Sequence, residues 1–186
     1  MAIKDIVNAM VTAHPLDRVP RAGFLLRGVT EPESVAAHSH SLALLVLLVC
    51  EEHPDEFDAS KATKMAVIHD LQEVATMDIP MPAGNARFKA AKDDTEEEIF
   101  RELFGAVSPG LAGLYTEFRA SESPEARLVR GLDKVQMMIK VHCYESENRG
   151  RLDDFWLNKG NFKSFGLPIL NDMFRHIAQL AGRVLP

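Results

Sequence analysis

The chain has 186 residues, of which 46% are hydrophobic and 26% are charged, and its net charge is −6 with histidine neutral. This length fits one domain over residues 1–186, and the composition excludes a disordered chain and a small disulfide-held scaffold. Lysine and arginine are scattered along the sequence, which argues against binding to a nucleic-acid backbone or to an anionic membrane.

The first part of the chain predicts two helices separated by a loop. Residues 2–14 are amphipathic, and prolines at 15 and 20 interrupt this pattern. Residues 21–30, RAGFLLRGVT, fit no helical pattern and are expected to form a loop. A long helix is predicted from Pro32 to about Glu52, because proline favours a first helical turn. Its apolar run at 42–50 has nine residues, about half of the roughly 18–20 that a membrane span needs, so no membrane segment is predicted.

The rest of the chain also has helical periodicity. Ser60 can cap a helix over 61–76, and residues 77–85, MDIPMPAGN, are expected to form a loop. The acidic run at 93–98 is expected to face solvent. Further helices are predicted over 86–105, 109–120, 124–148, 152–158 and 167–183. Because no segment alternates as a half-buried strand would, the predicted fold class is all-α.

The two cysteines and the N-terminal residues bear on the cellular compartment. Cys50 and Cys143 lie in apolar stretches without CxxC spacing, so we expect two buried thiols and no zinc knuckle or redox motif. The N-terminal residues lack the basic start and the apolar stretch of a secretory signal. The sequence therefore predicts a cytoplasmic protein.

The predicted helix 61–76 contains a possible metal site. His69 and Asp70 are adjacent, and Glu73 lies one helical turn after His69 on the same face. A charged Asp70 within the apolar AVIHDL is costly to bury unless a cation or hydrogen bonds satisfy it. Imidazole and carboxylate ligands suit Co, Mn, Mg, Zn or Fe, and one helix cannot surround an ion. We therefore expect further ligands on other helices.

Two residues on other predicted helices have the right chemistry. His38 lies on the helix that begins at Pro32, and Asp133 interrupts the apolar series of helix 124–148. Each has an ordinary alternative: a histidine of the core or surface, and a surface pair of Asp133 with Lys134. His40 lies on a different side of its helix from His38 and is a competing candidate for the ligand role.

The order of these segments resembles the HD-domain phosphohydrolases and, within them, the 5'-deoxynucleotidase branch. The resemblance implies an all-α HD-domain helical bundle, with core motifs over about 20–156 and a C-terminal helix over about 167–183. The residues that carry it are PRAGFLLRGV at 20–29, PESVAAHSHSLAL at 32–44, AVIHDLQEVATMDIP at 66–80, LVRGLDKVQM at 128–137 and GRLDDFW at 150–156.

The same resemblance implies a metal centre. The carboxylates of the HDxxExxxxD signature match Glu73 and Asp78, which we expect to be catalytic. At position 37 the branch often has an acidic residue and this chain has alanine. The residues that match the ligands of one divalent metal ion are His38, His69, Asp70 and Asp133.

The resemblance also implies a substrate site. Arg21 matches an arginine that holds the substrate phosphate, and Asp78 would accept a hydrogen bond from the sugar 3'-hydroxyl. A helix-end or turn role is the alternative for Asp78. Phe24 is the nearest candidate for the aromatic residue that the branch carries near this arginine. It would either stack on the base or pack in the core.

The implied activity is release of phosphate from (deoxy)ribonucleoside 5'-monophosphates by a homodimer that binds no nucleic acid. The metal would acidify a water molecule, and Glu73 would take or position its proton. The alternatives are an HD-type phosphodiesterase, a guanosine-polyphosphate hydrolase and a non-catalytic helical ligand-binding module. Arg21 favours monophosphates, and the presence of Glu73 and Asp78 argues against the non-catalytic module.

Overall fold

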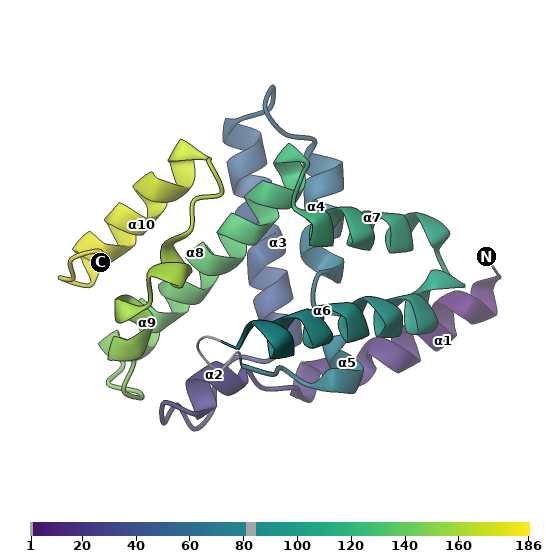
Figure 1. The fold of residues 1–186 in the computed structure, drawn as a ribbon, viewed down its shortest axis with the longest axis horizontal. Coiled ribbons are helices and arrows are strands. Elements are labelled where there is room, and N and C mark those ends of the chain that lie inside the picture. The colour runs from purple at the N-terminus through teal and green to yellow at the C-terminus, as the bar shows by residue number, and fades with distance from the viewer. Residues whose placement is uncertain (1, 81–84) are drawn as a thin grey trace.

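The computed structural model describes residues 2–80 and 85–186, and within these ranges it contains helices and turns without a β-strand (Figure 1). The fold class predicted from the sequence is therefore confirmed. Residues 81–84 of the predicted loop 77–85 lie outside the described ranges. The elements are α1 (Ile3–Ala13), η1 (His14–Arg18), α2 (Ala22–Leu25), α3 (Val35–Glu52), α4 (Ala59–Ile68), α5 (Glu73–Thr76), α6 (Ala86–Phe100), η2 (Arg101–Gly105), α7 (Pro109–Ala120), α8 (Pro124–Ser146), α9 (Asp153–Leu157), η3 (Lys159–Phe162) and α10 (Pro168–Leu180).

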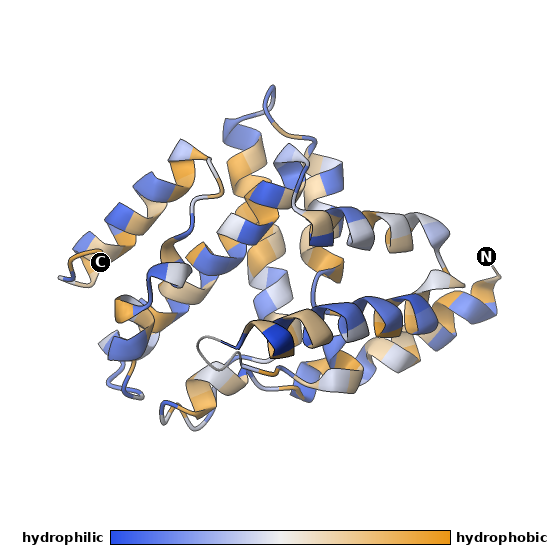
Figure 2. Ribbon diagram, viewed as in Figure 1, coloured by the Kyte–Doolittle hydropathy of each residue, from blue (hydrophilic) through white to orange (hydrophobic). Residues whose placement is uncertain are grey.

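Helices α3 and α8 form the centre of the molecule. Helix α3 packs against α4 and α8, and α10 packs on α8 (Figure 1). Figure 2 shows apolar residues along much of α3 and on one side of α10, which buries Leu170 and Phe174. By length and composition alone α3 could cross a membrane. In the fold it is instead the central helix, with apolar side chains buried among its neighbours.

Helix α3 begins three residues later than the sequence predicts. Ser34 is its N-cap, and the Ser34 hydroxyl accepts a hydrogen bond from the Ala37 backbone N–H at 3.1 Å. The residues before the cap pair with an earlier segment: the Arg21 N–H donates to the Glu33 carbonyl at 3.0 Å. This pairing holds Arg21 beside the start of α3. The predicted loop 21–30 also contains a short helix, α2.

The continuous helix predicted over 61–76 is wrong. Helix α4 is capped by Asp58, whose carboxylate accepts from the Lys61 N–H at 2.9 Å, so Ser60 is not the cap. After Ile68 the chain forms tight turns with hydrogen bonds between residues three apart, such as that from the Glu73 N–H to the Asp70 carbonyl. His69 and Asp70 therefore lie in a turn between α4 and α5 rather than on a helical face shared with Glu73.

Two expectations about exposure fail at single residues. The acidic run at 93–98 is exposed or half-buried except at Glu96, which is only 2% exposed. Its carboxylate oxygens lie 3.1 Å from Lys92 Nζ on the same helix and 3.4 Å from Arg119 Nη1 on α7, and these cations compensate its burial. Cys143 is half-buried, whereas Cys50 is buried as expected.

Met77, which follows α5, has a strained backbone. Its φ of 62° and ψ of 168° fall in a region that only glycine adopts readily. Two hydrogen bonds hold this conformation: the Met77 N–H donates to the Glu73 carbonyl at 2.9 Å, and the Thr76 hydroxyl donates to the Met77 carbonyl at 3.1 Å. The next residue, Asp78, accepts a hydrogen bond from the Ala22 N–H at 2.7 Å. The strained turn thus directs Asp78 toward α2.

We expect Met77→Gly to raise the free energy of unfolding by about 1 kcal/mol. Relief of roughly 1–3 kcal/mol of strain exceeds the roughly 0.5–1 kcal/mol that the freer glycine backbone costs on folding. Urea unfolding in the presence of a chelator measures the difference. Ala75→Gly is the control: Ala75 lies within α5, so this change should lower stability by about 0.5–1 kcal/mol. Equal losses for the two variants would contradict the assignment of strain.

Candidate metal centre

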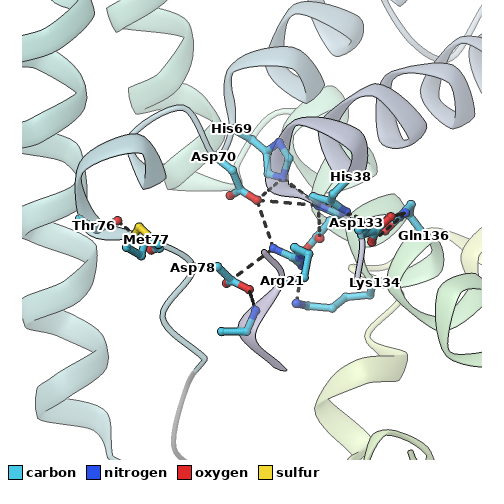
Figure 3. Close-up of polar contacts among 12 residues, drawn as sticks. Arg21, His38, His69, Asp70, Thr76, Met77, Asp78, Asp133, Lys134 and Gln136 are labelled. Carbon is cyan, nitrogen blue, oxygen red and sulfur yellow. Dashed lines mark hydrogen bonds and ion pairs between the residues drawn. The ribbon is translucent and has the colours of Figure 1, made fainter. Parts of the chain in front are cut away.

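Four side chains from three parts of the chain converge on one point: His38 on α3, His69 and Asp70 in the turn after α4, and Asp133 on α8 (Figure 3). His38 Nε2 lies 3.3 Å from His69 Nε2 and 3.2 Å from Asp133 Oδ1. Asp70 Oδ2 lies 2.9 Å from His69 Nε2 and 3.8 Å from His38 Nε2. The structure therefore brings together all four residues that the resemblance implies as ligands.

The donor atoms fit a divalent ion. His69 Nδ1 lies 2.8 Å from the Ala66 carbonyl, which only accepts, so this nitrogen carries the hydrogen and a neutral His69 presents its Nε2 lone pair. One ligand atom each from His38, His69 and Asp133 lie within 4.8 Å of one another. A proton can satisfy only one pair among these acceptors, whereas a divalent ion satisfies all of them. The set of two imidazoles and two carboxylates suits such an ion without specifying which one.

The two carboxylates of the cluster are held in the charged form. Burial raises the pKa of Asp70, but attraction to His69 and Arg21 outweighs it and holds the pKa well below its usual range. Burial likewise opposes ionisation of Asp133, yet Lys134 and His38 lower its pKa further than burial raises it. Two negative charges therefore face the point where the imidazoles meet.

Arg21 lies beside this cluster. Its Nη1 is 3.5 Å from Asp70 Oδ2 and 3.7 Å from Asp78 Oδ1 (Figure 3). Burial lowers the pKa of Arg21, but the charges of Asp78 and Asp70 outweigh it, so the pKa rises and the guanidinium stays charged. A fixed cation thus stands next to a candidate metal ligand, which is the arrangement that an anionic substrate needs.

Glu73 is a buried carboxyl close to the candidate ligands. It is 3% exposed, and its Oε2 has no hydrogen-bond partner among the described residues. Burial, together with the charges of Asp70 and Asp78, raises its pKa to about 10. Without a metal ion Glu73 is therefore protonated at neutral pH. Such a carboxyl is suited to proton transfer once a nearby positive charge favours its ionised form.

The structure separates the remaining candidates. Phe24 is 2% exposed and packs between Phe155 and Tyr144, with both ring centroids 5.1 Å away, which favours the core role over base stacking. His40 is exposed, whereas His38 is fully buried, so the competing ligand candidate points away from the cluster.

One contact of the cluster was missed in the sequence. Ala37 is exposed, and the side chain next to His38 Nδ1 is Gln136 Oε1, at 2.6 Å. The available signal was a polar residue within LDKVQM, between Val135 and Met137 and three positions after Asp133.

The sequence of this chain is similar to those of known proteins. The sequence profile of the HD domain matches residues 13–164. The 5'-deoxynucleotidase HDDC2 of Danio rerio is 34% identical over 165 residues, which cover 85% of this chain and 80% of the relative. The human protein of the same name is 31% identical over 147 residues, which cover 76% of this chain and 70% of the relative.

Solved structures share the arrangement of helices. The PH0347 protein from Pyrococcus horikoshii OT3 has a TM-score of 0.79 and 34% identity, covering 94% of this chain and 99% of its own. A predicted metal-dependent phosphohydrolase from Magnetospirillum magnetotacticum MS-1 has a TM-score of 0.71, and the match covers 99% of this chain and 96% of its own. At 21% identity the second likeness concerns the fold alone.

Proposed function

This chain belongs to the HD domain family, and on that premise we propose that it is a metal-dependent phosphohydrolase that releases phosphate from (deoxy)ribonucleoside 5'-monophosphates. The observation that carries the proposal is the convergence of two imidazoles and two carboxylates beside the charged Arg21. The relatives named 5'-deoxynucleotidase support the substrate class.

The residues of the site divide the chemistry between them. A divalent ion held by the two histidines and two aspartates would supply Lewis acidity, which acidifies water and offsets phosphate charge. Arg21 binds phosphate oxygens through its forked guanidinium, next to the position of the ion. Glu73 takes the proton of the attacking water. Glu73 can take a proton only in its ionised form, and its pKa is about 10 in the metal-free chain. A cation held by the neighbouring ligands would lower this pKa.

Asp78 connects phosphate binding with sugar recognition in this proposal. Its Oδ2 already accepts from the Ala22 N–H, and its Oδ1 lies 3.7 Å from Arg21 Nη1. A carboxylate has about four acceptor positions, so it can also accept a hydrogen bond from the sugar 3'-hydroxyl. Its contact with α2 keeps the sugar acceptor and the phosphate arginine in a fixed relation.

A homodimer and a cytoplasmic location are further proposals. Exposed Leu44, Leu47 and Leu48 share one face of α3, which supports a partner surface on that helix. Light scattering of the purified chain tests the first proposal, and microscopy of a tagged chain tests the second.

The proposed activity is tested by phosphate release from a substrate panel. The protein is stripped with a chelator and reloaded with Co²⁺, Mn²⁺, Mg²⁺, Zn²⁺ or Fe²⁺, one at a time. We expect at least one ion to restore release from deoxyribonucleoside 5'-monophosphates, with no release from 3'-monophosphates. Preference for a phosphodiester or for guanosine tetraphosphate would favour another HD-type hydrolase. Inactivity with every ion and substrate would support a non-catalytic module.

We expect Glu73→Gln to keep metal binding while turnover falls by roughly 10²–10⁴-fold, because the proton acceptor is lost. The same change should stabilise the metal-free protein. The pKa of Glu73 is about 10 in the folded chain and near 4.5 when unperturbed, so Glu73 ionises at lower pH in the unfolded chain than in the folded chain. The free energy of unfolding therefore falls as pH rises through this interval. Glutamine has no such loss, and the gain in stability should therefore be larger at pH 8 than at pH 5.

Thermal unfolding at both pH values and initial rates with the loaded enzyme test the Glu73 assignment. The matched control is Glu96→Gln, at another buried glutamate, which pairs with Lys92 and Arg119. That change should lower stability, since it removes a compensated charge. Full turnover in Glu73→Gln would refute the proton-acceptor role.

We expect Arg21→Ala to raise KM for the monophosphate by about 10-fold or more, from the loss of a charge-assisted contact of roughly 1.5–3 kcal/mol. Inorganic phosphate should also inhibit the variant less strongly. Arg27→Ala is the control, because Arg27 follows α2 and pairs at 3.0 Å with Asp154. An unchanged KM in Arg21→Ala would contradict the assignment of Arg21 as the residue that binds the substrate phosphate.

A further inference from the structure

A row of buried polar groups lies behind His38, on the side away from the other candidate ligands. His38 Nδ1 is 2.6 Å from Gln136 Oε1, and Gln136 Nε2 donates to both carboxylate oxygens of Glu33, at 3.3 and 3.0 Å. Lys140 Nζ lies 3.6 Å from Glu33 Oε2 at the outer end of the row. His38, Gln136 and Glu33 are 0%, 4% and 9% exposed. The row therefore reaches from the cluster to the surface without intervening solvent.

The direction of these hydrogen bonds follows from their chemistry. The Glu33 carboxylate only accepts, so the amide of Gln136 must turn its NH₂ group toward Glu33. Its oxygen then faces His38, and because an amide oxygen also only accepts, His38 Nδ1 must carry a hydrogen. A neutral His38 consequently has its lone pair on Nε2, the atom that faces His69 and Asp133.

We propose that Gln136, oriented by Glu33, is a positioning residue that holds His38 in the Nδ1–H tautomer and so presents Nε2 to the metal ion. The inference rests on the metal-binding part of the proposed function. An imidazole without such a partner exchanges between both tautomers, and the Nε2–H form has no lone pair to offer there. A partner on the other ring nitrogen thus raises the competent fraction and the apparent affinity for metal.

The two histidines of the cluster are oriented by different means. The Nδ1 of His69 donates to the carbonyl of Ala66, a backbone atom that no side-chain substitution removes. The acceptor for His38 is instead a side chain, which in turn depends on Glu33 for its direction. A substitution can therefore alter the tautomer of His38 while leaving that of His69 in place.

The amide of residue 136 has a specific advantage at this point. It accepts at one end and donates at the other, as the positions between His38 and Glu33 require. A carboxylate there would accept a hydrogen bond from His38, but the carboxylate of Glu33 would repel it. Exchange of the two groups should restore the pattern, because in Glu33→Gln/Gln136→Glu a carboxylate accepts from His38 and from an amide at position 33.

The experiment compares Gln136→Met with Gln72→Met, the same substitution at a glutamine that is also buried. Gln72 is 2% exposed, and its Oε1 has no hydrogen bond within the described structure. Zn²⁺ affinity is measured by competition with a chelating dye. Tautomers are read from long-range ¹H–¹⁵N correlation spectra of the metal-free, ¹⁵N-histidine-labelled protein, with His38→Gln used to assign the His38 signals. Thermal unfolding checks that each variant is folded.

We expect Gln136→Met to weaken Zn²⁺ binding by about 10–100-fold and to give His38 a detectable population with no hydrogen on Nδ1. Gln72→Met should bind within about twofold of the wild type, and the double exchange variant should recover most of the affinity lost in Gln136→Met. Three results would each overturn the inference: a wild-type His38 without a hydrogen on Nδ1, unchanged affinity in Gln136→Met, or equal losses in both methionine variants. A wild type that binds no divalent ion would overturn the metal centre as well.

Discussion

The structure depends on the positive charge that compensates a buried group of hydrogen-bond acceptors. This group lies where α3, α8 and the turn after α4 meet. Asp70 and Asp133 are ionised there, and two imidazoles bring their Nε2 atoms to 3.3 Å of each other. Arg21 offsets part of this charge from one side. In a medium of low dielectric constant such a group persists only with strong compensation. The site is therefore suited to a cation, and the charged Arg21 is suited to an anion beside it.

The sequence predicted the helical fold because apolar periodicity and proline positions are local signals. It also identified the four candidate ligands, although not Gln136. The patterns around His38 and Asp133 made them candidates, but only the resemblance to a family assigned them as ligands. Local signals could not reveal the break after Ile68, since the apolar spacing continues through it. The tight turns there are determined by tertiary packing and by the geometry of the cluster.

Contacts between distant segments were likewise beyond local reasoning. The hydrogen bond between Gln136 and His38 joins residues 98 positions apart, and its only trace in the sequence is a polar residue at a core position of α8. Phe24 illustrates the reverse case, because an aromatic residue near a functional arginine has the same sequence appearance whether it faces substrate or Phe155. Only the packing distinguishes the two roles.

Glu33 is attached to both halves of the site. Its carbonyl accepts the backbone N–H of Arg21 at 3.0 Å, while its carboxylate orients the amide that contacts His38. The proposed phosphate arginine and the candidate metal-binding imidazole therefore share one anchor at the start of α3. A displacement of this short segment would move both together, so anion binding and cation binding are expected to change in parallel.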